Sequence, residues 1–195
     1  MERAQRGDHK AFDQLIKLWY PKIYNFSYKY FADHDDACEV SQKTFIAVYT
    51  KLSQLKDLDK FRPWIYQIVS NYCHETQRKK RRTWINKHFP LTKRDPEQAV
   101  ISLDVEGRER NLQSDYTLFQ NELSGLLRKA LSMVCEEQRI IVIMKEYEGF
   151  KFSEIAEILQ ISENTAKSRL YYGLKKLKEI FKHWNITQEN LNYER

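Results

Sequence analysis

Apolar side chains recur at helical spacing through the first third of the chain. Residues 8–31 carry such a stripe, formed by Phe12, Leu15, Ile16, Trp19, Ile23 and Phe26. A repeat of three or four residues predicts an amphipathic helix with one face toward a core. A second stripe predicts a helix from about Asp36 to Leu52, after a turn at 33–36 whose acidic residues suit an N-cap and a first helical turn. We therefore expect a helical bundle to begin here.

A third helix is predicted from about Arg62, beyond a polar loop at residues 54–60. Pro63 stands near its start, where a missing N–H costs nothing. The helical pattern stops at about Thr83, and Pro90 and Pro96 interrupt the next segment of the chain. Sparse apolar residues and charges of both signs predict a linker at residues 83–116, partly disordered when free.

Helical spacing returns beyond the linker. One helix is predicted around residues 123–134 and a buried one around 140–144, ended by Glu148 and Gly149. Two short helices come next, and Phe181 and Trp184 close the last one before a polar tail. The sequence predicts an all-α fold of two small helical domains, residues 1–82 and 117–184, with the tail at 185–195.

The segment Phe152–Leu174 has the layout of a helix-turn-helix, whose second helix enters the DNA major groove. Ser162 is expected to cap this second helix, whereas the first has Lys151 at the capping position, so we expect Ser153 to cap it slightly late. The predicted outward face comprises Glu163, Asn164, Lys167, Ser168, Tyr171 and Lys175. The alternative is an ordinary helical hairpin with a solvated basic face.

Residues 61–82 combine aromatic side chains with five successive cations, Arg78-Lys79-Lys80-Arg81-Arg82. Aromatic rings beside cations suit unstacked bases, since rings stack on bases while cations hold phosphates. The alternative is that Trp64 and Tyr72 are core residues and the basic run is only solvated. The helix from Asp36 to Leu52, taken alone, has the polar outer face that any solvated helix shows.

Composition narrows the function classes. The 195 residues carry a net charge of +6, which favours an anionic partner without requiring one. Three separate cysteines with no CxxC predict small buried or half-buried thiols in a reducing cytosol rather than zinc sites or disulfides. We expect no signal peptide and no membrane insertion, because no apolar run approaches the roughly 20 residues of a membrane span. Catalytic, metal and cofactor motifs are not recognisable, so we expect no enzyme active site.

Taken together, DDACEVSQKTF, FRPWIYQIVSNYCHETQRKKRR, a linker and a helix-turn-helix resemble the extracytoplasmic-function sigma factors of bacterial RNA polymerase. The resemblance runs from about Asp8 to Phe181. It implies a non-catalytic cytoplasmic subunit that binds core polymerase through the beta and beta-prime subunits. Such a subunit recognises –35 and –10 promoter elements and promotes DNA melting. The linker would thread the polymerase cleft, and an anti-sigma factor is an expected partner.

The resemblance also assigns roles to residues. For core-polymerase binding they are Asp36, Glu39, Gln42, Phe45 and Tyr49. For the –10 element they are Lys56, Asp57, Lys60, Phe61, Trp64, Asn71, Lys79, Lys80, Arg81 and Arg82, with Asn71 and the loop at 55–60 holding a flipped base. For the –35 element they are Asn164, Thr165, Lys167, Ser168, Arg169, Tyr171, Tyr172 and Lys175. The sequence departs from the family's usual acids at Cys38 and Lys43.

Two other classes stay open at this point. A stand-alone regulator with a helix-turn-helix would usually dimerise and bind a palindrome. An RNA-processing or modifying enzyme with a basic surface would need a catalytic cluster, which the sequence does not display.

Overall fold

The computed structural model describes residues 1–88 and 115–186, and every regular element in these ranges is helical. The N-terminal module contains α1 (Glu2–Gln5), α2 (His9–Phe31), α3 (His34–Lys51), the 3-10 turns η1 (Leu52–Gln54) and η2 (Leu58–Lys60), and α4 (Phe61–His88). The C-terminal module contains α5 (Asp115–Ser132), α6 (Glu136–Val142), the π-helical turn η4 (Ile143–Tyr147), α7 (Phe152–Leu159) and α8 (Glu163–His183). The predicted all-α class is confirmed.

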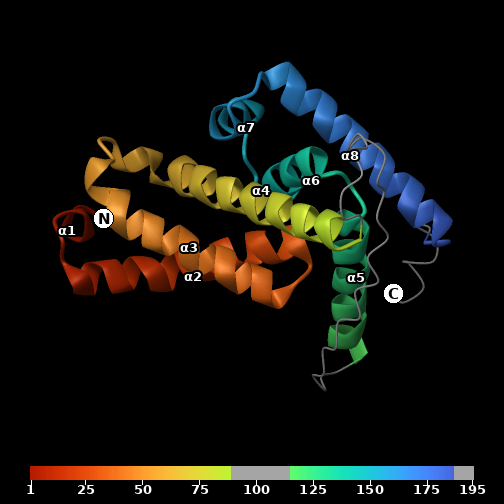
Figure 1. Ribbon diagram of the computed structural model, residues 1–195, viewed down its shortest axis with the longest axis horizontal. Helices are drawn as coiled ribbons and strands as arrows, with labels where there is room; N and C mark the ends of the chain where they lie inside the picture. Colours follow the sequence, from red (N-terminus) through yellow and green to blue (C-terminus); the bar gives the residue numbers. More distant parts are fainter. Residues whose placement is uncertain (89–114, 187–195) are drawn as a thin grey trace.

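Short polar side chains set the starts of the first long helices. The carboxylate of Asp8 accepts a hydrogen bond from the backbone N–H of Ala11 at 3.1 Å, and that of Asp33 accepts from Asp36 at 2.9 Å. Each bond satisfies an N–H that has no partner within its helix. Ala32, in the left-handed conformation at φ 55°, ends α2 and turns the chain into α3. The two helices then pack side by side as neighbours (Figure 1).

Helix α4 is longer than the sequence pattern indicates. It continues through residues 83–88, so the prediction that irregular structure begins at Thr83 is wrong for this segment. No glycine or proline interrupts these residues, and Trp84 and Ile85 stay half-buried, which favours a continued helix. Of the linker predicted at 83–116, residues 89–114 lie outside the described residues, and so does the end of the tail at 187–195.

In the C-terminal module, α7 and α8 form the predicted helix-turn-helix. Ser162 caps α8 as expected, accepting from the N–H of Thr165 at 3.0 Å. The prediction that Ser153 caps α7 late is wrong, because the helix already begins at Phe152. Its first turn is held instead by the carboxylate of Glu154, which accepts from the N–H of Lys151 at 2.7 Å.

The two modules pack against one another, with α4 lying between α2 and α3 on one side and α6 and α7 on the other (Figure 1). Arg139 of α6 is 6% exposed and crosses this boundary. Its guanidinium donates to the carbonyl of Tyr30 at 2.8 Å, and also to the carbonyls of Ser132 and Val134 at 2.8 Å. One side chain thus satisfies backbone oxygens of both modules. No helix in the described part of the chain is long and apolar enough to cross a membrane.

Candidate functional site

The outer face of α3 presents a mixed polar and apolar surface. Glu39, Gln42 and Tyr49 are exposed, as the sequence-based assignment requires, and Tyr49 keeps 55% of its surface accessible. Ile46 lies on the same helix and is 60% exposed, although the sequence analysis did not single it out. An isoleucine four residues after Gln42 on an otherwise polar face was the available signal. Exposed apolar side chains among polar ones suit contact with another protein.

Two residues assigned to the same surface are buried instead. Phe45 is 6% exposed and stacks on Tyr20, with 6.0 Å between ring centroids. Asp36 is 7% exposed, and its carboxylate accepts a hydrogen bond from the Lys80 ammonium of α4. Burial raises the pKa of Asp36, and the Lys80 charge opposes that rise. Direct contact between these two side chains and a partner would require them to move.

The start of α4 and the loop before it contain both buried and exposed side chains. Phe61 is 3% exposed and packs edge-on against Trp19, at 5.3 Å between centroids, so its ring belongs to the core. Lys56, Asp57 and Lys60 are exposed in the preceding loop. The carboxylate of Asp57 accepts from the N–H of Asp59 at 3.0 Å and thereby starts η2.

Asn71 is exposed on α4 but is not adjacent to that loop. Asn71 follows Phe61 by ten residues on α4, which is about 15 Å at a rise of 1.5 Å per residue. Trp64, half-buried, lies between them on the helix. Asn71 and the loop at 55–60 are therefore separated along the axis of α4 and do not form a single small pocket.

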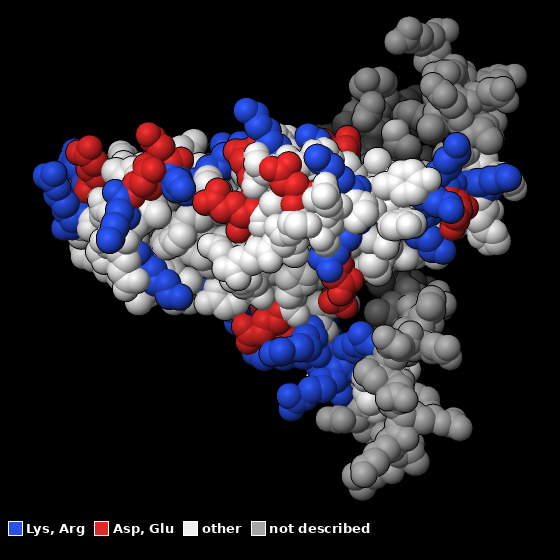
Figure 2. Space-filling view, turned by 90° about the horizontal axis from the view of Figure 1, so that it is seen from above, with Lys and Arg blue, Asp and Glu red and all other residues white. Residues whose placement is uncertain are grey.

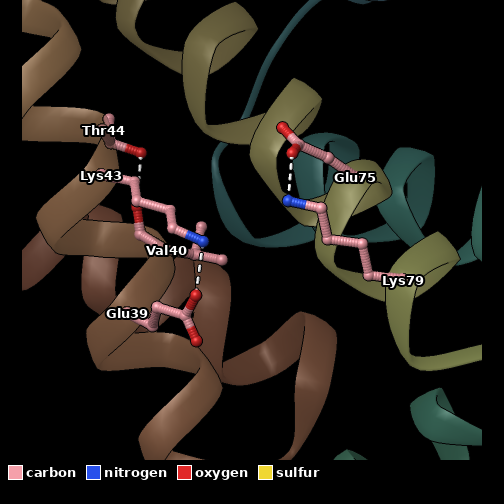
Figure 3. A network of polar contacts seen from close by, with 6 residues as sticks. All are labelled: Glu39, Val40, Lys43, Thr44, Glu75 and Lys79. Atoms are coloured by element: carbon pink, nitrogen blue, oxygen red, sulfur yellow. Dashed lines mark hydrogen bonds and ion pairs between the residues drawn. The ribbon is translucent and has the colours of Figure 1, made fainter. Parts of the chain in front are cut away.

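The basic run at residues 78–82 is exposed at all five positions, within the second half of α4. Three lysines near it are paired with carboxylates: Lys43 with Glu39, Lys79 with Glu75 at 2.5 Å, and Lys80 with Asp36. Figure 3 shows the first two pairs on α3 and α4, facing one another. In Figure 2 a dense group of basic side chains projects from the lower edge, with acidic ones at its border. Cations and anions are therefore intermingled here.

A groove of about 440 Å³ lies between α3 and the end of α4. It is lined by Asp36, Glu39, Lys43, Thr76, Lys79, Lys80, Thr83, Trp84 and Lys87. An indole and four ammonium groups provide the contacts that a nucleic-acid strand requires, a ring for a base and cations for phosphates. The carboxylates that line it compete for those cations. The groove therefore suits a nucleic-acid strand, and its affinity for that strand depends on how strongly the groove's own carboxylates pair with its lysines.

The first two-thirds of α8 form a second exposed basic surface. Asn164, Lys167, Ser168, Tyr171, Tyr172 and Lys175 are exposed, and Thr165 and Arg169 are half-buried. Tyr171 and Tyr172 keep 64% and 56% of their surfaces accessible. The Ser168 hydroxyl donates to the Thr165 carbonyl at 3.0 Å, and the Thr165 and Ser162 hydroxyls lie 2.8 Å apart. The two tyrosines are thus largely accessible, whereas the Thr165 and Ser168 hydroxyls are engaged within the helix.

The N-terminal half of α4 is covered by the C-terminal module. Tyr66 is 1% exposed, and its hydroxyl donates to the carboxylate of Glu148. Its ring meets that of Phe150 edge-on at 4.9 Å, and the Arg62 guanidinium lies 4.1 Å from the centroid of the Phe150 ring. Burial and the Glu148 hydrogen bond raise the pKa of the Tyr66 hydroxyl. Sequence patterns did not identify these contacts, because they join residues more than 80 positions apart.

A third feature, an open apolar groove of about 800 Å³, lies between α5, η4 and α8. Leu127, Leu131, Val142, Leu174, Leu177 and Phe181 line it, with Lys178 and Lys182 among its polar residues. The sequence predicts its helices, but not the gap that their arrangement leaves. Cys135 is also exposed, contrary to the expectation of buried or half-buried thiols.

Two parts of the chain match regions of one protein family. Residues 15–83 match Sigma-70 region 2 and residues 124–177 match Sigma-70 region 4. These ranges contain most of α2 to α4 and most of α5 to α8, respectively. The two exposed surfaces described above therefore lie in two different regions of the same family.

Curated relatives match along most of their length. The chain is 26% identical over 177 residues to the RNA polymerase sigma-H factor of Pseudomonas aeruginosa, covering 88% of this chain and 86% of that protein. It is 23% identical over 192 residues to the ECF RNA polymerase sigma factor SigW of Bacillus subtilis, covering 92% and 93%.

Solved structures share the fold. The sigma factor RpoE, in its complex with the anti-sigma factor NepR from Bartonella quintana, matches with a TM-score of 0.62 at 23% identity, over 89% of this chain and 98% of that one. CnrH, in complex with the cytosolic domain of CnrY, matches with a TM-score of 0.64 at 18% identity, over 93% and 94%. Both likenesses extend over the two modules.

Proposed function

The chain belongs to the sigma-70 family and is a sigma factor of the extracytoplasmic-function type, and on this premise we propose how its surfaces divide the work of transcription initiation. The exposed face of α8 binds the –35 element, α4 with its preceding loop binds and helps to open the –10 element, and α3 docks on core RNA polymerase. The observation that carries this proposal is the presence of two separate exposed basic surfaces on one chain, in α4 and in α8.

The α8 surface supports duplex recognition. A helix capped by Ser162 and projecting Asn164, Lys167 and Tyr171 has the size and polarity for the major groove. Lys175 is positioned beyond them along the helix for a phosphate contact. Since the –10 surface lies elsewhere on the same chain, a second copy and a palindrome are unnecessary. A stand-alone regulator would leave the region 2 match unexplained.

The α4 surface supports contact with an opened strand. Opening the duplex costs a few kcal/mol per unstacked base, and binding of extruded bases and phosphates offsets this cost. We assign base contacts to Trp64 and Asn71 and phosphate contacts to the cations at 78–82. The loop residues Lys56 and Lys60 extend this surface toward the helix start.

The α3 surface supports docking on the polymerase. Gln42, Ile46 and Tyr49 form an exposed strip, and Glu39 lies one turn before Gln42. We propose that this strip contacts the beta-prime subunit and that the C-terminal module contacts the beta subunit. The chain itself contributes no catalysis, because nucleotide addition belongs to the polymerase. We place it in the cytoplasm with that enzyme.

An anti-sigma factor is the further partner we propose. The two structural neighbours are described as complexes with the anti-sigma factor NepR and with the cytosolic domain of CnrY. We propose that such an inhibitor covers the exposed strip of α3.

Reconstitution with core RNA polymerase tests the proposal. The purified chain should co-purify with core enzyme and direct transcripts from one fixed start site on promoter DNA. A Gln42→Ala and Tyr49→Ala double variant should lose co-purification while its helix content stays unchanged. A chain that neither joins core polymerase nor fixes a start site would refute the sigma function, and a footprint symmetric over two half-sites would favour the regulator.

Base capture by Asn71 has its own test. Asn71→Ala should reduce formation of the open complex more than that of the closed complex, because the extruded base exists only after opening. Permanganate reactivity of unpaired thymines measures opening, and gel retention measures closed binding. Equal loss of both would contradict base capture.

A further inference from the structure

Two neighbouring lysines of the basic run have different partners. The Lys79 ammonium pairs at 2.5 Å with Glu75, one turn earlier on α4, and the two side chains are 63% and 42% exposed. The Lys80 ammonium pairs instead with Asp36 of α3, whose side chain is only 9% exposed. One pair is therefore local and solvated, while the other joins two helices and has a buried acid.

This difference decides how easily each lysine can change partner. A solvated pair within one helix contributes little, because water and salt screen it, so a DNA phosphate can replace Glu75 at Lys79 with little cost. The Asp36 carboxylate is largely withdrawn from water, and burial raises its pKa. Removing Lys80 from it would leave a buried charge without compensation, which is strongly unfavourable.

A phosphate that approached Lys80 without displacing Asp36 would gain little as well. The ammonium charge is already balanced by the carboxylate, and a second anion would then lie beside the first. Counterions leave the DNA only where a protein cation neutralises a phosphate, so a lysine that stays with its carboxylate adds little to the salt dependence of DNA binding. Whether or not a phosphate displaces Asp36, contact with Lys80 therefore adds little to DNA affinity.

We propose that Asp36 withholds Lys80 from DNA, so that of these two adjacent lysines Lys79 contacts the phosphate backbone and Lys80 does not. Asp36 is thus a positioning residue that sets the phosphate affinity of the groove between α3 and α4. This inference rests on the proposed function, specifically on DNA binding by α4. It replaces the role of polymerase contact that the resemblance implied for Asp36, and it excludes Lys80 from the phosphate contacts assigned above to the basic run at 78–82.

The first experiment compares Lys79→Gln with Lys80→Gln in the full chain. Binding of a labelled mixed-sequence single-stranded DNA oligonucleotide is measured over a series of salt concentrations. Lys79→Gln should reduce the slope of log affinity against log salt by about 0.7, the value for one phosphate contact on a single strand. Lys80→Gln should leave the slope unchanged. An equal reduction of slope in both variants would overturn the proposal.

The second experiment releases Lys80. Asp36→Asn removes the carboxylate charge at constant size, and the affinity should rise about threefold to tenfold with a slope steeper by about 0.7. Asp35→Asn is the matched control, since Asp35 is exposed in the same first turn of α3 and brings the same change in net charge. It should raise the affinity less and leave the slope unchanged. Equal effects of the two substitutions would show a general charge effect and contradict the proposal.

The measurements distinguish failure of DNA binding by α4 from failure of the role proposed for Asp36. Thermal unfolding of each variant checks that the fold is kept, and the lysine comparison stands even if Asp36→Asn does not fold. If the unaltered chain bound no DNA in any of these conditions, the proposed DNA binding by α4 would fail, whereas the sigma function is tested separately by co-purification with core polymerase. If it bound DNA and Lys80→Gln weakened the salt dependence as Lys79→Gln does, only the role of Asp36 would be refuted.

Discussion

The two basic surfaces of this protein are built in different ways. On α8 the exposed cations are supported by local features, a serine cap at its start and ion pairs with Glu163 and Glu179 that span 3.8 Å within the same helix. On α4 the basic run meets Glu75 of its own helix and Asp36 of α3, and the pair that matters most joins Lys80 to Asp36, 44 residues away. A local surface can be recognised from a short sequence, whereas a surface that depends on distant partners cannot.

The largest expected effect concerns Arg139, which connects the modules that carry the two surfaces. Arg139→Met should lower the free energy of unfolding by about 3 kcal/mol, because the carbonyls of Tyr30, Ser132 and Val134 lose their donor in a buried site. Chemical denaturation measures this loss. Arg6→Met, at an exposed position, should stay within about 0.5 kcal/mol of the unaltered chain.

The same variant tests whether the surfaces are independent. Since neither basic surface includes Arg139, the folded fraction of Arg139→Met should retain –35 and –10 binding per molecule. Loss of one binding activity in fully folded protein would indicate that the surfaces are coupled through α6. The α8 surface would then depend on more than contacts within its own helix.

The next effect concerns the close approach of α8 to α6. A Cβ atom on Gly173 would lie 2.9 Å from Cγ2 of Val142 and 3.3 Å from Cβ of Gln138, which is closer than ordinary contact. Gly173→Ala should therefore lower the free energy of unfolding by about 1–2 kcal/mol, as overpacking exceeds the gain in helix propensity.

Gly125→Ala provides the matched control for this substitution. Gly125 also lies within a helix, but its added Cβ would meet only an Arg128 side-chain nitrogen at 3.8 Å. This variant should be about 0.5–1 kcal/mol more stable, because alanine restricts the unfolded chain. Thermal unfolding of the two variants measures these opposite changes in stability. A change of the same sign in both variants would contradict the close packing of α8 on α6.

These glycines illustrate which features of the fold could be predicted from the sequence. Helical periodicity was sufficient for the helix-turn-helix and its Ser162 cap, because such features depend on residues within one or two turns. The extension of α4 past Thr83 was missed, since a charged and weakly amphipathic segment gives little periodic signal. That Gly173 lies against Val142 is a consequence of the packing of α8 on α6, which spacing does not reveal.

In the candidate site, too, features set by neighbouring residues were predicted and features set by tertiary contacts were not. Exposed positions on α8 are set by helical geometry after a known cap, and they agree with the predicted outward face. On α3 and α4 the family resemblance assigned partner contacts to Asp36, Phe45 and Phe61, but tertiary contacts bury all three. Burial of a short polar side chain such as Asp36 depends on which cation approaches it from elsewhere in the chain.

The cap of α8 should contribute an intermediate effect. Ser162→Ala removes the oxygen that accepts from the N–H of Thr165 and should cost about 1 kcal/mol of stability. Ser168→Ala is the control, because the Ser168 hydroxyl donates to the Thr165 carbonyl within the helix and contributes little there. Thermal unfolding distinguishes them. Similar losses would mean that the α8 surface does not depend on its local cap.

The smallest effect tests the α8 surface directly against the withheld lysine of α4. Lys167→Ala should weaken binding of a –35 duplex about threefold and reduce the salt slope by about one, since the Lys167 ammonium is exposed and its Glu163 partner is 3.8 Å away and solvated. Lys182→Ala, on the same helix but beyond the predicted contact face, should change neither quantity. Fluorescence anisotropy over a salt series measures both, and co-purification with core polymerase should be unaffected. If Lys167 behaved as Lys80 is expected to behave, with no change in slope, then solvated pairing within a helix would withhold a lysine as effectively as a buried acid does. The distinction between the two surfaces would then have to rest on the approach of the DNA rather than on burial of the carboxylate.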